Sequence, residues 1–485
     1  MSLVVVIIYS LALLLIFLFS LGQLNLTRHY LKSKKSPDPA CKELTKFPHV
    51  TVQLPVYNEL YVIERLIDAV VAFDYPKDKL EIQVLDDSTD ETVSLIAEKV
   101  AELKKEGIDI VHVRRSDREG YKAGALKHGL EIAKGEFIPI FDADFIPKKD
   151  FLMKTIPYFE DENIGVVQTR WGHINKDYSM LTRLQAFGLD AHFSVEQIGR
   201  SHSGSFINFN GTAGVWRQTC IEEAGGWSAD TLTEDLDLSY RAQLKGWKFK
   251  FLEAEESPAE LPIIMPAIKS QQYRWNKGAA ETAKKNLSKV LKSNIGFENK
   301  VHAVFHLFNS AIFICLLVAA VFSVPMLLIK YNFPGYEMVF NLGSIFLIGF
   351  FSIGYFYWIA AKRMVPNGTF KYFFKTFPVF LVVSMGLSLH NAIAVIEGLW
   401  GIKTPFVRTP KFNVATKKES WKGNIYIKYN FNPLAIIEGL LSIYFLFAIG
   451  LGIYLHDFGL IAFHVMLAIG YGSVFYHSVK PSNFA

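Results

Sequence analysis

The chain has 485 residues, of which 51% are hydrophobic and 14% aromatic, and its formal net charge at pH 7 is +5. This length is enough for more than one domain, and the small net charge without a dense basic block argues against nucleic-acid binding. The cysteines, Cys41, Cys220 and Cys315, are widely and irregularly spaced. That spacing excludes a CxxC metal site and a disulfide scaffold, and it indicates a reducing compartment.

Hydrophobic residues are distributed unevenly. Residues 3–22 and 301–479 are strongly apolar, whereas residues 30–300 have the mixed composition of a soluble domain. The first apolar run has no basic segment before it and is about twenty residues long, too long for the hydrophobic part of a signal peptide. A basic cluster follows it: Arg28, His29, Lys32, Lys34 and Lys35. We therefore expect an uncleaved anchor, with its N-terminus outside and its basic flank in the cytoplasm.

Strand-like and helix-like segments alternate between residues 49 and 252. Strands are predicted at 49–56, 80–87, 109–115 and 136–144, and helices at 58–73, 90–107 and 121–135. This alternation indicates a mainly parallel, doubly wound α/β sheet. No GxGxxG motif follows the first strand and no GxxxxGK[ST] motif is present, so the usual dinucleotide and P-loop fingerprints are missing.

Two pairs of carboxylates lie at the predicted carboxyl ends of strands, where such sheets bind ligands. Asp142 and Asp144 follow the buried-strand-like stretch "FIPIF". Side chains two apart on a strand point the same way, so this pair makes a hard oxygen site for Mg²⁺ or Mn²⁺; a polar turn is the alternative. Asp86 and Asp87 end another strand and suit hydrogen bonds to a base or ribose, although nearby residues also suit helix capping.

Several shorter motifs each allow two interpretations. Tyr57 suits stacking on a base, or simple packing. Lys122 begins a helix and suits a phosphate, or is a surface lysine. Asp235 suits a general base held in a first helical turn, while Thr231 and Glu234 have the spacing of a capping box.

The stretch "QQYRW" at 271–275 precedes the apolar region. Arg274 has the planar fork that binds a diphosphate, and Trp275 suits the wall of a sugar site. The alternative is a basic, aromatic helix that lies on the bilayer.

Four C-terminal segments, 303–329, 339–361, 434–455 and 458–479, have the length of membrane spans. Counting the ambiguous stretch 376–400 as a further span would place the lysine-rich loop 402–428 outside, against the positive-inside tendency. We therefore predict an α/β domain plus transmembrane α-helices, with one N-terminal and four C-terminal spans and an interfacial helix at 376–400.

The order of these motifs resembles the processive, inverting glycosyltransferases of family two, which include cellulose, mannan, chitin and hyaluronan synthases. The stretches "VLDDSTD", "GYKAGAL", "FNGTAGVWR" and "TEDLDLSYRAQLKGW" look especially like the cellulose-synthase-like mannan and glucan synthases. The resemblance runs from about Val50 to Lys411. It implies a cytosolic, GT-A-like mixed sheet flanked by helices that binds a nucleotide sugar. The expected domains are an anchor at 1–27, a transferase domain at 45–290, spans within 301–361 and 434–479, and an interfacial helix with a gating-like loop at 370–428.

The resemblance also implies a role for each motif. The donor would be bound by Tyr57, Glu59, Asp86, Asp87, Lys122, Asp142, Gln271, Arg274 and Trp275. Asp142 and Asp144 would hold Mg²⁺ or Mn²⁺, and Asp235 would deprotonate the acceptor hydroxyl. The acceptor would contact Phe209, Gly211, Thr212, Glu234 and Trp275, although Asn210 stands where the family has cysteine. Phe406, Thr409 and Lys411 match a gating motif, in which Arg408 replaces valine.

We therefore expect an integral membrane polysaccharide synthase, in a bacterial cell membrane or a eukaryotic endomembrane. It would elongate a β-linked mannan or glucan from a nucleotide-diphosphate sugar and pass the chain through its own spans. UDP-glucose and GDP-mannose stay open as donors, and an accessory export subunit is compatible with the resemblance. One alternative is a transferase that glycosylates a membrane lipid, like ceramide glucosyltransferases; the gating-like loop argues against it. A non-catalytic transporter is disfavoured because the acids cluster outside the spans.

Overall fold

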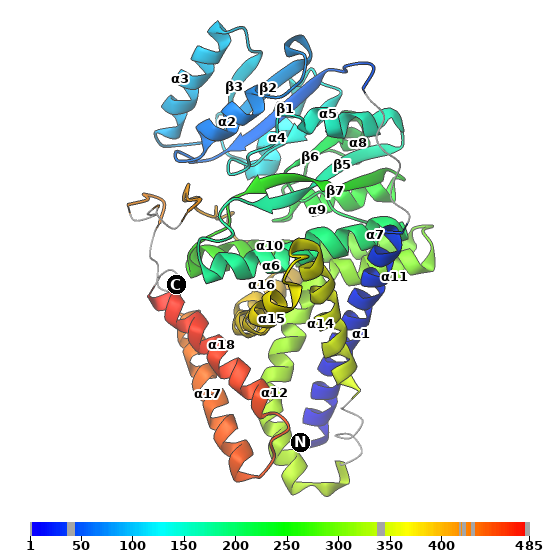
Figure 1. The fold of residues 1–485 in the computed structure, drawn as a ribbon, viewed down its shortest axis with the longest axis vertical. Helices are drawn as coiled ribbons and strands as arrows, with labels where there is room; N and C mark the ends of the chain where they lie inside the picture. The colour runs from blue at the N-terminus through cyan, green and yellow to red at the C-terminus, as the bar shows by residue number, and fades with distance from the viewer. Residues whose placement is uncertain are drawn as a thin grey trace.

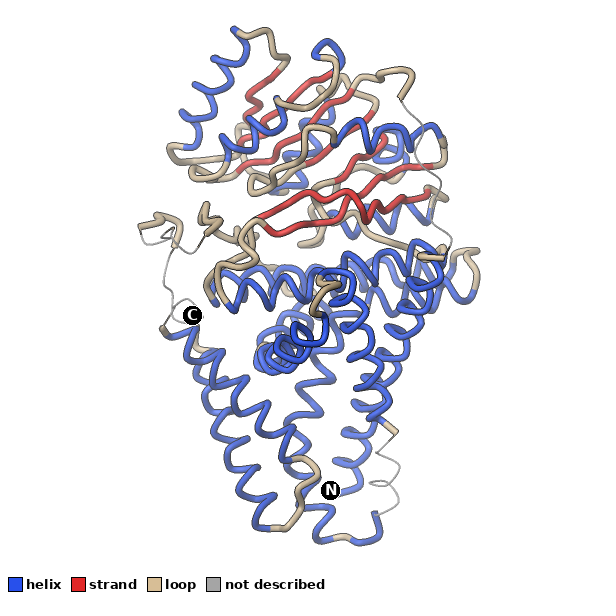
Figure 2. The backbone as a smooth tube through the Cα atoms, in the orientation of Figure 1, coloured by secondary structure: helices blue, strands red, loops and turns tan. Residues whose placement is uncertain are grey.

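The computed structural model describes residues 2–35, 44–336, 345–416, 419, 423–427 and 432–480. Among these residues, a seven-stranded sheet with its helices forms one end of the molecule and long helices form the other (Figure 1). Figure 2 shows the same division, with all strands gathered at one end.

The sheet is mixed. Its strands are β1 (Val50–Val56), β2 (Leu80–Asp86), β3 (Ile110–Arg114), β4 (Phe137–Ile140), β5 (Ile164–His173), β6 (Gly214–Arg217) and β7 (Lys248–Ala259). Their order is β3-β2-β1-β4-β6-β5-β7. The first four strands are parallel, as expected, and β6 runs antiparallel to both β4 and β5. The prediction of a mixed sheet flanked by helices is confirmed. Because β5 and β7 are again parallel, only the two pairings of β6 depart from the expected parallel arrangement.

Helices cover the sheet and extend from it. Those around the sheet are α2 (Ile63–Val71), η1 (Lys77–Lys79), α3 (Thr92–Lys105), α4 (Tyr121–Glu131), α5 (Phe151–Thr155), η2 (Ile156–Glu160), α8 (Gln218–Glu223) and α9 (Glu234–Leu244). The others are α1 (Ser2–Ser33), α6 (Met180–Ala191), the π-helical η3 (His192–Glu196), α7 (Gln197–Ser203), α10 (Met265–Lys292), α11 (Phe297–Leu307), η4 (Asn309–Ala311), α12 (Ile312–Asn332), η5 (Pro334–Tyr336), α14 (Phe346–Met364), α15 (Thr369–Gly386), α16 (Ser388–Trp400), α17 (Leu434–Tyr454) and α18 (Ile461–Val479).

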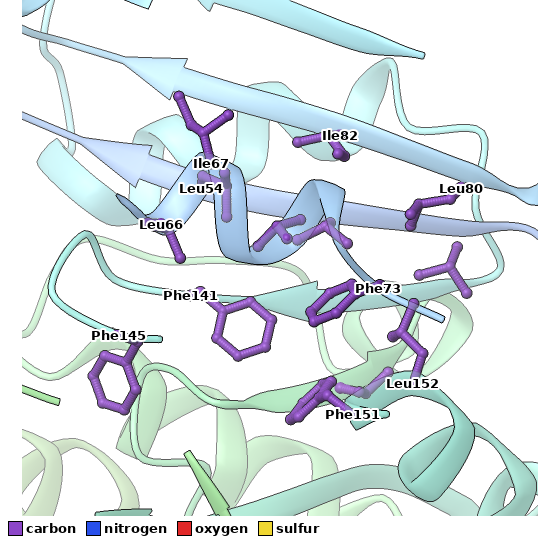
Figure 3. Packing of buried hydrophobic residues seen from close by; sticks show 14 of the residues in the cluster. Leu54, Leu66, Ile67, Phe73, Leu80, Ile82, Phe141, Phe145, Phe151 and Leu152 are labelled. Carbon is purple, nitrogen blue, oxygen red and sulfur yellow. The ribbon is translucent and has the colours of Figure 1, made fainter. Parts of the chain in front are cut away.

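One hydrophobic cluster lies between the sheet and α2 (Figure 3). Leu66 and Ile67 of α2 are fully buried there. Phe141, just after β4, packs on Phe73 and Phe151 with ring centroids 6.1 and 4.9 Å apart. Each such buried side chain contributes roughly 1.5–3 kcal/mol. The cluster therefore fixes the backbone at the point where the chain leaves β4 and the first carboxylate emerges.

The predicted strand at 136–144 is too long. β4 ends at Ile140, and the backbone turns directly afterwards because the Phe145 amide donates to the Asp142 carbonyl at 3.0 Å. Asp142 and Asp144 therefore lie in a turn and not on one face of a strand. Their exposure differs accordingly: the Asp142 side chain is 37% exposed and that of Asp144 is 4% exposed.

The helical end contains three described helices that are long and apolar enough to cross a membrane: Ser2–Ser33, Asn309–Asn332 and Leu434–Tyr454. The helices α15 and α16 together form a pair bent by 51°, which is either a broken span or a re-entrant element. In Figure 1, α15 lies across the direction in which α1, α12 and α17 run. The predicted number of spans stays a prediction. Residues 339–344 of the expected second C-terminal span, and Lys417, Lys418, Lys422 and Lys428 of the basic loop, lie outside the described residues.

Candidate active site

A cleft of about 670 Å³ opens at the carboxyl ends of β1, β2 and β4. The loops after these strands supply one wall, and α10 and the segment 406–411 supply the other. Its lining, within the described residues, is Pro55, Val56, Tyr57, Glu59, Asp87, Arg118, Lys122, Ala125, Asp142, Ala143, Asp144, Arg274, Phe406, Arg408, Thr409 and Lys411. Most of the predicted donor, metal and gating residues therefore meet in one place.

Asp86 and Asp87 are divided between core and cleft. Successive residues at a strand end point to opposite sides, so one of the two can face the ligand. Asp87 lines the cleft, and Arg115 holds it with two hydrogen bonds of 3.0 and 2.5 Å. Asp86 is 1% exposed, accepts a hydrogen bond from the Ser88 amide and lies 2.8 Å from His112 Nε2. In this structure Asp86 therefore supports the strand end, and its expected contact with the donor stays a prediction.

Hydrogen bonding also keeps Asp86 charged. Burial by itself raises the pKa of this carboxyl, but the hydrogen bonds from His112 and Ser88 lower it by more, so the pKa lies below its ordinary value.

An arginine stacks on Tyr57 at one end of the cleft. The Arg118 guanidinium carbon is 3.2 Å from the centre of the Tyr57 ring and 5.0 Å from that of Tyr121. Its Nε is buried and has no hydrogen-bond partner among the described residues. Tyr57 and Arg118 thus offer two flat surfaces and an unsatisfied donor, which together suit a planar base.

Lys122 joins three parts of the site. Its ammonium lies 2.5 Å from Asp142 Oδ1 and donates to the Gly211 carbonyl at 2.8 Å. Burial lowers the pKa of Lys122, but Asp142 and Glu234 raise it by more, so the lysine is held in its charged form. Gly211 has φ +79°, and a Cβ there would lie 3.0 Å from Asp235 Oδ2. Glycine therefore allows the backbone to approach both Lys122 and Asp235 closely.

Asp144 is paired with the segment that covers the cleft. Lys411 Nζ lies 2.7 Å from Asp144 Oδ2, while Asp144 Oδ1 is buried without a hydrogen-bond partner in the described part of the chain. No group of three or more His, Cys, Asp or Glu side chains able to hold a metal occurs in the described residues. Mg²⁺ needs only one or two carboxylates when phosphate oxygens complete its shell. Asp142 and Asp144, with one unsatisfied carboxylate oxygen, fit that kind of site.

Asp235 lies in the first turn of α9 and is half-buried. Burial and the charge of Glu234 raise the pKa of Asp235 to about 7, against the opposing effects of Lys122 and Arg274. A carboxylate with a pKa near neutrality is suited to proton transfer. The predicted capping box is not formed, because Thr233 is the N-cap residue and makes no side-chain capping bond.

The segment 406–411 closes one side of the cleft. Arg408 lies 2.7 Å from Glu59, and Phe406 stacks on Tyr121 with ring centroids 5.7 Å apart. Arg274 lies over the Phe406 ring at 5.0 Å. Burial raises the pKa of Glu59 to about 7, although Arg408 and Lys411 oppose this rise. The cations of this segment therefore pair with the carboxylates of the cleft.

Gln271 and Trp275 do not reach this cleft. Both line a second cavity of about 800 Å³, which lies among α6, α10, α15 and α16 and is walled by apolar side chains such as Leu184, Phe380 and Val383. Consecutive helical residues point about 100° apart, which separates Arg274 from Trp275. Gln271 and Trp275 therefore line a different cavity from Arg274, and their expected roles toward donor and acceptor stay predictions.

Two predicted acceptor residues, Phe209 and Thr212, are buried in the protein core. Phe209 is fully buried and packs on Trp216 with ring centroids 5.4 Å apart, so it lies in the core and not at a cavity wall. Thr212 is also fully buried, and its hydroxyl accepts a hydrogen bond from the Asp142 amide at 2.8 Å. Thr212 therefore positions Asp142. Glu234, by contrast, lines an adjoining pocket with Lys122 and Phe406.

The sequence interpretation did not identify Arg115 and Arg118, and it treated Arg408 only as a departure from a motif. A usable signal was present: Arg115 ends the third predicted strand and Arg118 follows it, so both reach the same sheet edge as Asp87.

The fold and the cleft together define a GT-A-like glycosyltransferase domain joined to apolar helices. The model of the family described as "Glycosyltransferase like family 2" matches residues 48–286. Glucomannan 4-beta-mannosyltransferase 1 of Oryza sativa subsp. japonica is 36% identical over 391 residues, which cover 77% of this chain and 71% of that protein. The chain therefore belongs to the cellulose-synthase-like glycosyltransferases of family 2, the family of these relatives, and the predicted family is confirmed.

Other relatives match over a shorter region. Glucomannan 4-beta-mannosyltransferase 2 of Arabidopsis thaliana is 43% identical over 270 residues, 54% of this chain and 51% of that protein. The chain spans about half the length of Glucomannan 4-beta-mannosyltransferase 2 and of three other curated relatives that it matches. A solved mannosyltransferase from Pyrobaculum calidifontis, in complex with GDP-Man and Mn²⁺, has a TM-score of 0.56 and 19% identity over 82% of this chain and all of that one. This likeness shows the shared fold.

Proposed function

We propose that the protein is a membrane-embedded, inverting hexosyltransferase that adds mannosyl units from a nucleotide-diphosphate sugar to a growing β-linked polysaccharide. The observation that carries the proposal is that Asp235 lies beside Gly211 and Lys122, which pairs with Asp142 at the cleft, and that the Asp235 pKa is raised to about 7. The mannosyl specificity rests on the relatives, which are named glucomannan 4-beta-mannosyltransferases.

The donor would lie along the cleft. Its base would stack near Tyr57 and Arg118, with Asp87 accepting hydrogen bonds from base or ribose, as Arg115 holds that carboxylate in place. Its diphosphate would lie between Lys122 and Arg274, the two cations that flank Asp142 and Phe406. Such preorganised cations stabilise the charge that develops on a leaving diphosphate.

The acceptor hydroxyl would attack the anomeric carbon from the side opposite the diphosphate. Asp235 would take the proton from that hydroxyl as the new bond forms, which requires its carboxylate form. Asp142 and Asp144 would hold Mg²⁺ or Mn²⁺, which supplies further neutralisation of the diphosphate when it is bound. Lys411 would have to leave Asp144 for this ion to bind, and the segment 406–411 would therefore act as the gate.

The second cavity would receive the acceptor end of the polymer. Trp275, Gln271 and the apolar walls between α10 and α16 suit the flat faces and hydroxyls of a sugar chain. We further propose that the sheet end lies in the cytoplasm, that α15 and α16 lie at the interface, and that the other long helices carry the product across the bilayer. The transferase domain would occupy residues 45–290.

The proposal is tested with the purified full chain in lipid nanodiscs. Labelled GDP-mannose and UDP-glucose are each supplied with Mg²⁺ or Mn²⁺, and the product is separated by size and by extraction into organic solvent. We expect a mannose-containing polymer that a β-mannanase digests. A product confined to the lipid extract would contradict elongation of a polysaccharide and support lipid glycosylation.

A further inference from the structure

A groove runs along α1 beside α14, apart from both cavities described above, and its volume, open to the surroundings, is about 1020 Å³. Its lining is Leu21, Leu24, Asn25, Arg28, Leu31 and Lys32 of α1, Lys35 in the turn that follows, and Tyr355 of α14. The α1 residues recur every three or four positions, so they form one stripe along the helix. The stripe changes in character along its length, from leucines to an amide to cations.

The cations at one end of the stripe are available for a ligand. Arg28, Lys32 and Lys35 are all exposed, and within the described residues none of them forms an ion pair. Lys34, which is not part of the groove lining, is instead paired with Glu253 of β7. The structure thus uses one cation of this region to hold α1 against the sheet and leaves the other three facing the groove.

A polar atom between the leucines and the cations is unsatisfied. Asn25 Oδ1 is buried and has no hydrogen-bond partner in the described part of the chain. An unmet buried acceptor is costly, and a donor from a bound molecule would relieve that cost. Tyr355, which is 43% exposed, faces the same groove from α14.

We propose that this groove binds an anionic phospholipid. The phosphate would lie among Arg28, Lys32 and Lys35, the glycerol region and headgroup hydroxyls beside Asn25, and an acyl chain against Leu21 and Leu24. From Leu21 to Arg28 the helix rises roughly 10 Å, comparable with the roughly 5–8 Å of polar region on one side of a bilayer. The inference rests on the proposed membrane position of α1, because a bilayer lipid reaches the groove only if that helix crosses the bilayer.

The three unpaired cations favour an anionic phospholipid over a neutral lipid or a free phosphate. Basic pockets beside transmembrane helices attract anionic lipids because unpaired cations at the membrane surface favour negative headgroups. A neutral lipid would satisfy Asn25 and the leucines but leave three positive charges uncompensated. A free phosphate would meet the cations but leave the apolar part of the groove empty.

The test uses the full chain and native mass spectrometry with an equimolar mixture of phosphatidylcholine and phosphatidylglycerol, without donor sugar. We expect the unaltered chain to retain phosphatidylglycerol preferentially. The combined variant Arg28→Gln, Lys32→Gln, Lys35→Gln should bind it on the order of 100-fold more weakly. The matched control Lys104→Gln, Lys105→Gln, Lys127→Gln removes the same charge from exposed helices of the sheet end and should leave the preference unchanged.

Three outcomes would overturn the proposal: no preference in the unaltered chain, an equal loss in the control, or competition by glycerol phosphate as strong as by the whole lipid. If the triple variant fails to insert, Asn25→Leu and the groove-filling Leu24→Trp keep every cation and should still weaken binding several-fold. Polymer synthesis is measured separately. Lipid binding without synthesis would contradict the proposed function alone, and synthesis without lipid selectivity would contradict this inference alone.

Discussion

The cleft and the second cavity lie on two faces of α10 and differ in nearly every physical property. The cleft is walled by carboxylates and cations that pair with one another, such as Lys122 with Asp142 and Lys411 with Asp144. The second cavity is walled mainly by leucine, valine and phenylalanine from α6 and α15. Arg274 belongs to the first and its neighbour Trp275 to the second.

Under the proposed function, this difference separates two tasks. The charged cleft would hold and release the diphosphate, and the apolar cavity would contact the sugar chain. Because consecutive helical residues point about 100° apart, one short stretch of α10 serves both spaces. Substitutions on the two sides should therefore have different kinetic consequences.

The largest effect is expected from Asp235→Asn. This change keeps the size of the side chain but removes the base, so transfer should fall by ~10²–10⁴-fold. Initial rates at saturating donor measure it, and unchanged binding of labelled nucleotide shows that the cleft is intact. Near-normal synthesis would remove Asp235 from the mechanism.

Arg274→Ala should lower the turnover rate by about 10²–10³-fold, because a preorganised cation beside the leaving diphosphate is lost. Lys284→Ala, further along the same helix, is the control for changes in helical propensity. An Arg274→Ala enzyme that still works at the normal rate with weaker membrane attachment would assign the residue to the bilayer.

Trp275→Ala should change the product more than the donor kinetics. Loss of an aromatic wall in the second cavity should shorten the polymer, while the donor KM stays within about threefold, a difference of less than 1 kcal/mol. Product length by gel filtration and donor titrations measure the two quantities. A raised donor KM with unchanged polymer length would show that Trp275 contacts the donor and not the polymer.

The pH dependence of kcat/KM should report the Asp235 carboxyl. Its pKa is raised to about 7, so the active carboxylate form grows as pH rises through that value, and the rate should rise by up to about tenfold per unit below it. The free energy of unfolding changes in the opposite direction. Because the pKa of Asp235 is raised in the native state, its contribution to stability is fully present below the pKa of the unfolded chain. That contribution is lost as the pH rises through about 7. Asp235→Asn should flatten both profiles, and a profile unchanged in that variant would contradict the assignment.

The smallest catalytic effect is expected from Phe209→Leu. This residue lies in the core with Trp216, so the smaller side chain should cost roughly 1–3 kcal/mol of unfolding free energy and leave the acceptor KM unchanged. Thermal unfolding and chain-length profiles test this. A large change in acceptor KM with normal stability would restore Phe209 to the acceptor site.

Much of this arrangement was predictable from local sequence patterns. Alternating strands and helices give the parallel half of the sheet, and the rule that ligands bind at carboxyl ends of strands places Tyr57, Asp87 and Asp142 together. The pattern failed where neighbouring residues divide between two environments. Asp86 and Asp87 are adjacent in sequence, as are Arg274 and Trp275. The sequence does not tell which member of each pair faces the cleft, because that depends on the direction of each side chain on its strand or helix.

The sequence by itself determined the family, the apolar helices and the residue types of the cleft, because these depend on composition, periodicity and motif order. Tertiary structure alone decided which carboxylates line the cleft, that Phe209 and Thr212 are buried, and that Arg118 and Arg408 enter the cleft. It also decided that the cations of 406–411 pair with Glu59 and Asp144, residues roughly 270 to 350 positions earlier in the chain. Such pairings depend on distances between separate elements, which only packing sets.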